Sequence, residues 1–135
     1  MRCLQIGIEN IILGRTIILI SLKLEKPMQE QIDDAEFYTE IYLDNILIGD
    51  ISGTLTEKDL HIELFWLDRP YRRQGYGTTV MNQLKDICRE SGLSNINAEC
   101  RGELIPFYSN LGADFKPRCE FDTTYINNRF YIDLN

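Results

Sequence analysis

Residues 60–92 read LHIELFWLDRPYRRQGYGTTVMNQLKDICRESG, and this stretch decides the fold because its periodicity changes in the middle. Up to Leu67 the residues alternate, and β-branched and aromatic side chains are concentrated, which is typical of a strand. After Gly75 the apolar residues recur at the three- and four-residue steps of a buried helical stripe. Gly92 stands where a left-handed cap ends a helix. We therefore expect a strand, a glycine turn, and a helix that ends near Ser91.

The segments on either side of this stretch predict more strands than helices. Before it, strands are expected at residues 2–8, 16–24, 36–43 and 46–54; after it, a strand at 95–100, a short helix at 103–111, and strands at 115–122 and 129–134. The order predicts a single α/β domain over residues 1–135, with a mixed, mostly antiparallel sheet and few helices. Its centre is a parallel strand–helix–strand crossover over residues 60–100, right-handed by default.

Composition narrows the class of partner. The chain has 135 residues, 44% of them hydrophobic, and a formal net charge of -7. An acidic chain is poorly suited to nucleic acid, whose phosphates are neutralised by clustered Lys and Arg, so we expect a cationic or amine-bearing partner instead. The most apolar run, residues 11–24, is interrupted by Arg15, Ser21 and Lys23, so no membrane span is expected. A secretory signal is not expected either, and the cytoplasm is the predicted location.

The cysteines and the single histidine do not predict a metal site. No two cysteines form a C-x-x-C pair, and His61 is not near any of them in sequence. Cys88 lies on the apolar stripe of the predicted helix and is expected to be a core residue. The four cysteines are Cys3, Cys88, Cys100 and Cys119.

The turn before the helix is the place where a ligand is most expected. Glycines allow a backbone to turn with its N–H groups towards a ligand, and the first turn of a helix offers unpaired donors and the positive end of its dipole. A dinucleotide fingerprint fails because position 80 is Val where the third glycine is needed, and because the strand ends too far before Gly75. A phosphate-binding Walker A loop fails because no Lys-Ser or Lys-Thr follows the glycines.

The pattern Arg72-x-x-Gly75-x-Gly77, opening an amphipathic helix after a strand, resembles the GNAT superfamily of acetyl-coenzyme A-dependent N-acetyltransferases. The resemblance spans residues 60–115. The sequence of residues 75–78, with Met81-Asn82, Leu84 and Lys85 after it, is especially similar to the histone acetyltransferase branch. A second element agrees: Phe107-Tyr108, Leu111-Gly112 and Phe115 are similar to the family's tyrosine-bearing helix and the turn after it.

The resemblance implies a GNAT-like fold with acetyl-CoA as cosubstrate and no metal. The family parts the strand before the helix from the next parallel strand, which leaves backbone groups free to pair with the pantetheine arm. The residues that the resemblance assigns to cofactor binding are the backbone N–H groups of Gln74, Gly75, Tyr76, Gly77 and Thr78 for the pyrophosphate, Arg72 and Arg73 around it, and Phe65, Trp66 and Leu67 beside the arm.

Transfer of an acetyl group to an amine needs a base for the amine and an acid for the leaving thiolate. By the resemblance, the place of Tyr108 is similar to that of the family's catalytic tyrosine, and Tyr108 is the candidate acid. Alternation predicts residues 60, 62, 64 and 66 on one face of the strand, as core, and His61, Glu63, Phe65 and Leu67 on the other. His61 and Glu63 are therefore both candidate bases, by direct or water-relayed proton transfer. Cys100 is a third candidate, as an acetyl-accepting nucleophile in a two-step reaction.

The expected function is transfer of the acetyl group to a primary amine, of a small cationic molecule or of a protein lysine or N-terminus, by direct attack in a ternary complex. A non-catalytic acyl-CoA-binding regulatory module is the alternative. Residues 26–35 are too few for the helices that usually roof the family's acceptor site, so the pocket is either more open or completed by a partner subunit, as in a homodimer. This region is acidic, through Glu30, Asp33, Asp34, Glu36 and Glu40.

Overall fold

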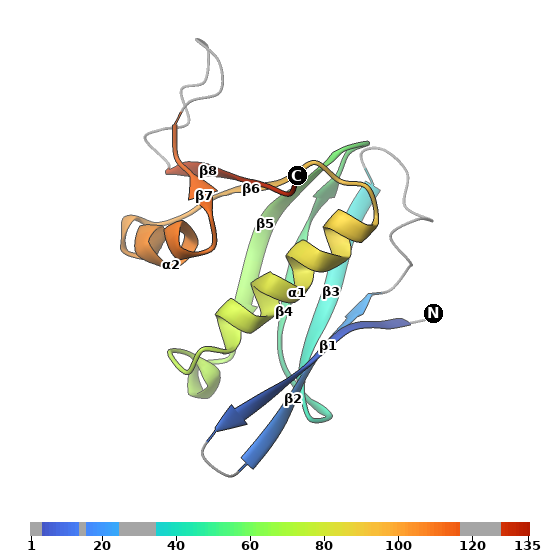
Figure 1. Ribbon diagram of the computed structural model, residues 1–135. Coiled ribbons are helices and arrows are strands. Elements are labelled where there is room, and N and C mark those ends of the chain that lie inside the picture. Colours follow the sequence, from blue (N-terminus) through green and yellow to red (C-terminus); the bar gives the residue numbers. More distant parts are fainter. Residues whose placement is uncertain (1–3, 14–15, 25–34, 117–127) are drawn as a thin grey trace.

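The computed structural model describes residues 4–13, 16–24, 35–116 and 128–135, and these form one eight-stranded sheet crossed on one face by a long helix (Figure 1). The strands are β1 (Leu4–Leu13), β2 (Thr16–Leu24), β3 (Ala35–Leu43), β4 (Ile46–Leu55), β5 (Asp59–Leu67), β6 (Asn95–Glu99), β7 (Ala113–Asp114) and β8 (Arg129–Asp133). The helical segments are the short turn η2 (Arg69–Tyr71), α1 (Tyr76–Glu90), the short turn η3 (Gly102–Leu104) and α2 (Ile105–Asn110). None of the helices in these residues is long and apolar enough to cross a membrane.

The sheet has the predicted mixed topology. Its strand order is β1-β2-β3-β4-β5-β6-β8-β7. Among the described strands, β5 and β6 form the parallel pair and all other neighbours are antiparallel. The helix α1 connects the two parallel strands, which confirms the central crossover.

The helix α1 begins and ends at glycines. Gly75 at its N-cap has φ 87°, and Gly92 after its C-terminus has φ 86°, a region that glycine occupies without steric cost. The N–H of Leu93 donates to the carbonyl of Cys88 and the N–H of Gly92 to that of Arg89, the pairing of a Schellman motif. The predicted end of this helix is thus confirmed to within one residue.

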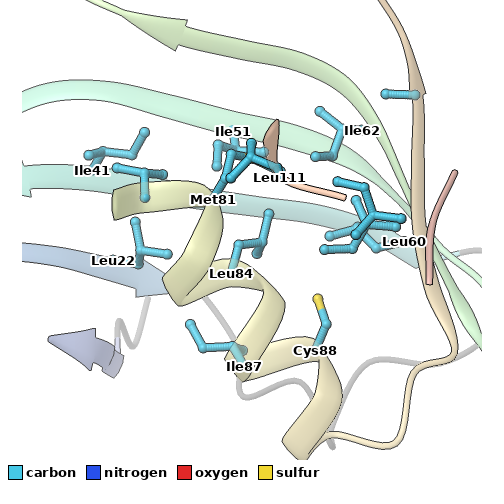
Figure 2. Packing of buried hydrophobic residues seen from close by; sticks show 14 of the residues in the cluster. Leu22, Ile41, Ile51, Leu60, Ile62, Met81, Leu84, Ile87, Cys88 and Leu111 are labelled. Atoms are coloured by element: carbon cyan, nitrogen blue, oxygen red, sulfur yellow. The ribbon is translucent and has the colours of Figure 1, made fainter. Parts of the chain in front are cut away.

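The buried face of α1 packs on the sheet to form the core (Figure 2). Fully buried members include Val80, Met81 and Leu84 on the helix. Cys88 is buried as predicted, and burial raises the pKa of its thiol to about 12, so it is a core residue and not a nucleophile. Figure 2 shows Met81, Leu84, Ile87 and Cys88 of α1 facing Leu22, Ile41, Ile51, Leu60 and Ile62 of the sheet.

Two strand predictions were wrong in their bounds. The first strand was expected at residues 2–8 and runs from Leu4 to Leu13. A strand was expected at residues 115–122, but β7 is Ala113–Asp114 and the next two residues are outside any strand. There the Lys116 N–H donates to Asp114 Oδ1 at 2.9 Å, and a side chain that accepts a backbone hydrogen bond in this way turns the chain. Residues 117–122 are outside the described part of the chain.

Candidate active site

The turn between β5 and α1 leaves the first turn of the helix without a cap. Gly75, at the N-cap, has no side chain that could accept a hydrogen bond from the helix, and the first turn contains no acidic residue. The N–H groups of Tyr76, Gly77 and Thr78 precede the first intrahelical donor, so the helix itself offers them no acceptor. Together with the helix dipole, these donors form a site suited to an anion such as a pyrophosphate. The start of α1 therefore leaves backbone donors without an intrahelical acceptor at the predicted turn.

Gly77 lies close to two other elements of the site. A Cβ built on it would lie 3.3 Å from Cζ of Phe107 and 3.8 Å from Cδ1 of Leu67. The first turn of α1, the end of β5 and the start of α2 therefore meet at this glycine. The two sequence elements that carry the family resemblance, the glycine turn and the Phe107-Tyr108 pair, are in contact.

Arg72 is held beside the end of β5. Its Nε donates to the Leu67 carbonyl at 2.7 Å, and its guanidinium carbon lies 4.2 Å from the centroid of the Trp66 ring. The Trp66 indole in turn donates to Asp68 at 3.0 Å. The Arg72 side chain is thus bound to the last residues of β5. The predicted role of Arg72 around the pyrophosphate did not include these contacts.

The remaining polar residues of the turn have different surroundings. The Gln74 side chain donates to the Pro70 carbonyl at 2.6 Å and so braces the turn. Arg73 is exposed and has φ 61°, a left-handed conformation that costs free energy for a residue with a side chain.

The strands β5 and β6 part beside this turn. Their parallel pairing runs from Asp59 and Asn95 to Ile62 and Ala98, and β5 then continues to Leu67 without β6 (Figure 1). Residues 63–67 therefore pair only with β4, and the backbone groups on their other side have no partner strand among the described residues. A gap of this kind accepts an extended ligand that carries amides.

A β-bulge at Glu63 corrects the predicted faces of β5. Ser52 pairs with Leu64 while Gly53 pairs with Ile62, so Glu63 is an extra residue and the alternation is shifted after it. The predicted placement of Leu64 and Trp66 in the core was wrong, because these side chains are 51% and 48% exposed.

Beyond the bulge, the two faces of β5 exchange their residues. Phe65 and Leu67 lie on the face that α1 covers and pack against the core. They therefore do not point the same way as His61 and Glu63, contrary to the prediction. We name the other side of the sheet, which carries Thr54, His61, Leu64 and Trp66, the open face.

The candidate acid Tyr108 is buried on α2. It is 7% exposed, and its ring stacks on Phe130 at 4.3 Å and meets Phe107 edge-on at 4.8 Å. Burial, and to a smaller extent the neighbouring Cys100, raise the pKa of the Tyr108 hydroxyl to about 12. A tyrosine in this state keeps its proton at neutral pH and is able to donate it.

Cys100 follows β6 and is only partly buried. Its Sγ lies 3.8 Å from the Asn128 carbonyl, and burial together with the charge of Glu103 raises the pKa of its thiol. A raised pKa keeps the sulfur as a thiol, which is a weak nucleophile. Cys3 and Cys119 are outside the described residues.

The two candidate bases lie on the open face. The His61 Nδ1 is 2.7 Å from Asn97 Oδ1, and Glu63 is exposed and accepts a hydrogen bond from the Thr54 hydroxyl at 2.9 Å. His61 is one residue before the position at which β5 and β6 part. The candidate residues thus divide between the two sides of the gap, with Tyr108 on the α2 side and the bases on the other.

Sequence reasoning missed the neighbours of His61. Asn97 is 5% exposed, and Arg129 donates to it from β8 at 3.2 Å. The signal was present in β6, because Asn95 and Asn97 alternate with apolar residues in a short strand. Buried amides in such a position need hydrogen-bond partners.

The described residues contain no group of His, Cys, Asp and Glu that could hold a metal ion, and the acidic stretch of residues 26–34 is outside them. Acids are nevertheless frequent on the open face. By register, the described ones are Glu36, Glu40, Asp50, Asp59, Glu63, Glu99 and Asp133.

A comparison with protein families and solved structures agrees with this geometry. The model of the acetyltransferase (GNAT) family matches residues 16–113. The structure is similar to that of GCN5 from Tetrahymena, with a TM-score of 0.64 and 15% sequence identity over 74% of this chain and 69% of that one.

Two further solved structures share the fold. The ribosomal-protein-S18-alanine N-acetyltransferase of Escherichia coli matches with a TM-score of 0.60 and 16% identity over 74% of this chain and 70% of its own. PaiA N-acetyltransferase of Thermoplasma acidophilum, solved with coenzyme A, matches with a TM-score of 0.56 and 15% identity over 73% of this chain and 59% of its own.

Proposed function

Because this chain belongs to the GNAT family of acetyltransferases, we propose that it transfers the acetyl group of acetyl-CoA directly to a primary amine in a ternary complex. The observation that carries the proposal is the parting of β5 and β6 after Ile62 and Ala98, next to the uncapped start of α1. The free edge and the uncapped donors supply the two contacts that a pantetheine pyrophosphate needs.

The residues of the turn would hold the cosubstrate in two ways. The N–H groups of Gln74, Gly75, Tyr76, Gly77 and Thr78 are proposed to bind the pyrophosphate, with Arg73 near it. The backbone of Phe65, Trp66 and Leu67 is proposed to pair with the arm. Arg72, tied to the Leu67 carbonyl, would fix the end of that edge and add positive charge.

Acetyl-CoA supplies a thioester, whose carbonyl carbon bonds to the amine nitrogen as the bond to sulfur breaks. His61 is the proposed base, because it lies on the open face next to the point where the strands part. It would take one proton from the amine, directly or through water, and Glu63 is the second candidate. Tyr108 would give its proton to the leaving sulfur from the opposite side of the gap.

The proposed acceptor is a cationic amine, either a polyamine or a basic peptide. Support comes from the carboxylates of the open face, where Glu36 lies opposite Thr54 on β4 and the Thr54 hydroxyl donates to Glu63. A cluster of like charge concentrates an oppositely charged partner and speeds its encounter. Arg129 also meets this face, through its hydrogen bond to Asn97.

The test is thiol release from acetyl-CoA in the presence of amines, with the acetylated acceptor identified by mass. We expect activity with spermidine and with a lysine-containing basic peptide, and little with an alkyl monoamine of similar length, which carries a single charge. Thiol release with none of the amines, despite acetyl-CoA binding, would leave the non-catalytic binding module as the function.

The Tyr108→Phe variant tests the acid. We expect kcat to fall about 100-fold, within the ~10²–10⁴ of general acid catalysis. Stability should change little, because the hydroxyl has no hydrogen-bond partner among the described residues. Since the pKa of Tyr108 is raised to about 12, its proton remains in place up to pH 10, and the parent kcat should not decline on the alkaline side below that pH. An unchanged kcat in Tyr108→Phe across this range would exclude the role.

A further inference from the structure

His61 ends a chain of hydrogen bonds that crosses from β5 to β6 and returns. His61 Nδ1 is 2.7 Å from Asn97 Oδ1, Asn97 Nδ2 is 2.9 Å from Asn95 Oδ1, and Asn95 Nδ2 is 2.6 Å from Asp59 Oδ1. We call these four residues the amide relay. The parallel register makes it possible, because Asp59 lies opposite Asn95 and His61 opposite Asn97.

The direction of every bond in the amide relay follows from its carboxylate end. The Asp59 carboxylate accepts, so the Asn95 group that faces it is the NH₂. The Asn95 oxygen is then left to accept from the NH₂ of Asn97. Asn97 therefore turns its oxygen towards His61, and an amide oxygen only accepts.

Arg129 fixes the same orientation from the other side. Its Nη2 donates to Asn97 Oδ1 at 3.2 Å, and a guanidinium has donors alone. A reversed Asn97 would place its NH₂ against this guanidinium and its oxygen against the oxygen of Asn95, so both hydrogen bonds would be lost. Since Asn97 is buried, water does not replace those bonds freely.

We propose that Asn97, oriented by Asn95 and Arg129, is a positioning residue that fixes neutral His61 as the tautomer with its proton on Nδ1. The lone pair is then on Nε2, which is the atom that would take the proton of the acceptor amine. The tautomer assignment rests on the hydrogen bonds alone, whereas its use in catalysis rests on the proposed function.

The charged and titratable groups around His61 are accounted for by register. On β5 itself the neighbours are Glu63 and, at the end of the relay, Asp59, and the partner on β4 is the uncharged Thr54. The groups contributed by β6 and β8 are Glu99, Arg129, Tyr131 and Asp133. The group that contacts Nδ1 is a neutral amide held by one cation. A neutral amide oxygen selects the tautomer by accepting the proton on Nδ1.

The assignment is measurable without any activity, because the chain has one histidine. Long-range ¹H–¹⁵N correlation spectra at a pH above the titration of the ring report which nitrogen is protonated. We expect Nδ1–H in the parent, opposite to the preference of free histidine in water for Nε2–H. A parent spectrum with the proton on Nε2 overturns the proposal.

Two variants of Asn97 connect the tautomer to the reaction. In Asn97→Leu the acceptor is lost, and we expect the Nε2–H form together with a 10- to 100-fold lower kcat/KM, part of the roughly 10²–10⁴ that a positioned base contributes. In Asn97→Asp the acceptor is kept, so the Nδ1–H form should persist, and the acidic limb of the kcat/KM profile should move to higher pH because the new carboxylate favours the charged ring. Asn82→Leu, an exposed change of the same kind on α1, is the control and should match the parent.

Each failure has its own signature. A tautomer that switches in Asn97→Leu with an unchanged kcat/KM would remove the catalytic part of the proposal. If Asn97→Leu does not fold, the parent spectrum and the pH profile of Asn97→Asp still decide, and a profile that does not move counts against the proposal. Absence of thiol release in the parent would contradict the proposed function, whereas the ¹H–¹⁵N spectrum would still test the tautomer of His61.

Discussion

The two halves of β5 differ in how many strands they pair with. Residues 59–62 have partner strands on both sides, whereas residues 63–67 have one on the β4 side only. The first half carries His61, whose ring is fixed by a neighbour on β6. The second half presents a free backbone edge beside the start of α1. Pairing holds a side chain in place, and lack of pairing leaves room for a ligand.

The bulge at Glu63 separates the two halves of β5. It shifts the alternation of β5, so that Ile62 and Phe65 lie on the same face although the sequence spacing between them is odd. The shift brings Phe65 and Leu67 under α1 and turns Trp66 outward to Arg72. One inserted residue therefore decides which side chains of residues 64–67 lie under α1 and which lie on the open face.

The largest expected effect comes from a change at this junction. A Cβ on Gly53 would collide with the carbonyl of His61, where neither backbone has a way to move aside. In Gly53→Ala we expect the free energy of unfolding to fall by roughly 3 kcal/mol, the upper range for overpacking. We also expect kcat/KM to fall by about 100-fold, because a displacement of ~1 Å has that effect on a positioned group.

Urea denaturation and steady-state kinetics measure these two effects. Gly102→Ala is the matched control, since the nearest atom to its added Cβ is 3.9 Å away, and it should leave stability within about 0.5 kcal/mol. Parent-like stability and kinetics in Gly53→Ala would mean that the junction tolerates displacement and that the two halves are not separately fixed.

A smaller effect is expected from Gly77→Ala, a change in the first turn of α1, beside the unpaired residues 63–67 of β5. The new Cβ would lie 3.3 Å from the Phe107 ring, so the first turn of α1 and α2 must move slightly apart. We expect the KM for acetyl-CoA to rise about 3- to 10-fold, equivalent to roughly 1 kcal/mol. Stability should be retained or rise, because Ala suits a helix better than Gly by up to ~1 kcal/mol.

The double variant Gly77→Ala with Phe107→Leu should recover part of the lost affinity, since the smaller side chain leaves space for the methyl group. Kinetics of the four chains give the coupling between the two positions. Independent effects would show that Phe107 does not set the position of the turn.

The smallest effect is expected at the end of the free edge. Arg72→Met removes the hydrogen bond to Leu67 and the contact with Trp66, each worth about 0.5–1 kcal/mol at an exposed site. The melting temperature should fall slightly, and the KM for acetyl-CoA should rise a few-fold. Arg73→Met serves as the comparison, because the Arg73 side chain is exposed and its loss should change KM without changing stability. Equal stability of both variants would contradict the proposed role of Arg72 in fixing the end of the free edge.

Much of the fold was predictable because its signals are local. The glycines at 75 and 92 bound α1, and the apolar spacing between them identifies its buried face. The crossover follows from one strand on each side of that helix. The resemblance named the glycine turn and the Phe107-Tyr108 element separately, and their close approach at Gly77 is a finding of the structure.

What could not be predicted depends on register. Strict alternation placed Trp66 in the core, because the sequence of β5 contains no mark of a bulge and the glycine that permits it, Gly53, is on another strand. The pairing of His61 with Asn97 joins residues from two strands separated by a whole helix, and only the parallel register brings them together. The resemblance names the candidate site residues, and the register decides which of their atoms face one another.

The free edge of residues 63–67 also affects the stability of the folded chain, apart from any role in catalysis. Unpaired strand edges are where chains adhere to one another, and proteins usually protect them. Here the edge lies inside the sheet, between strands that diverge, and the proposed occupant is a metabolite. A ligand that binds only the folded chain stabilises it in proportion to the logarithm of its concentration. The chain would then last longest in cells rich in acetyl-CoA, so that metabolic supply would govern its abundance as well as its rate.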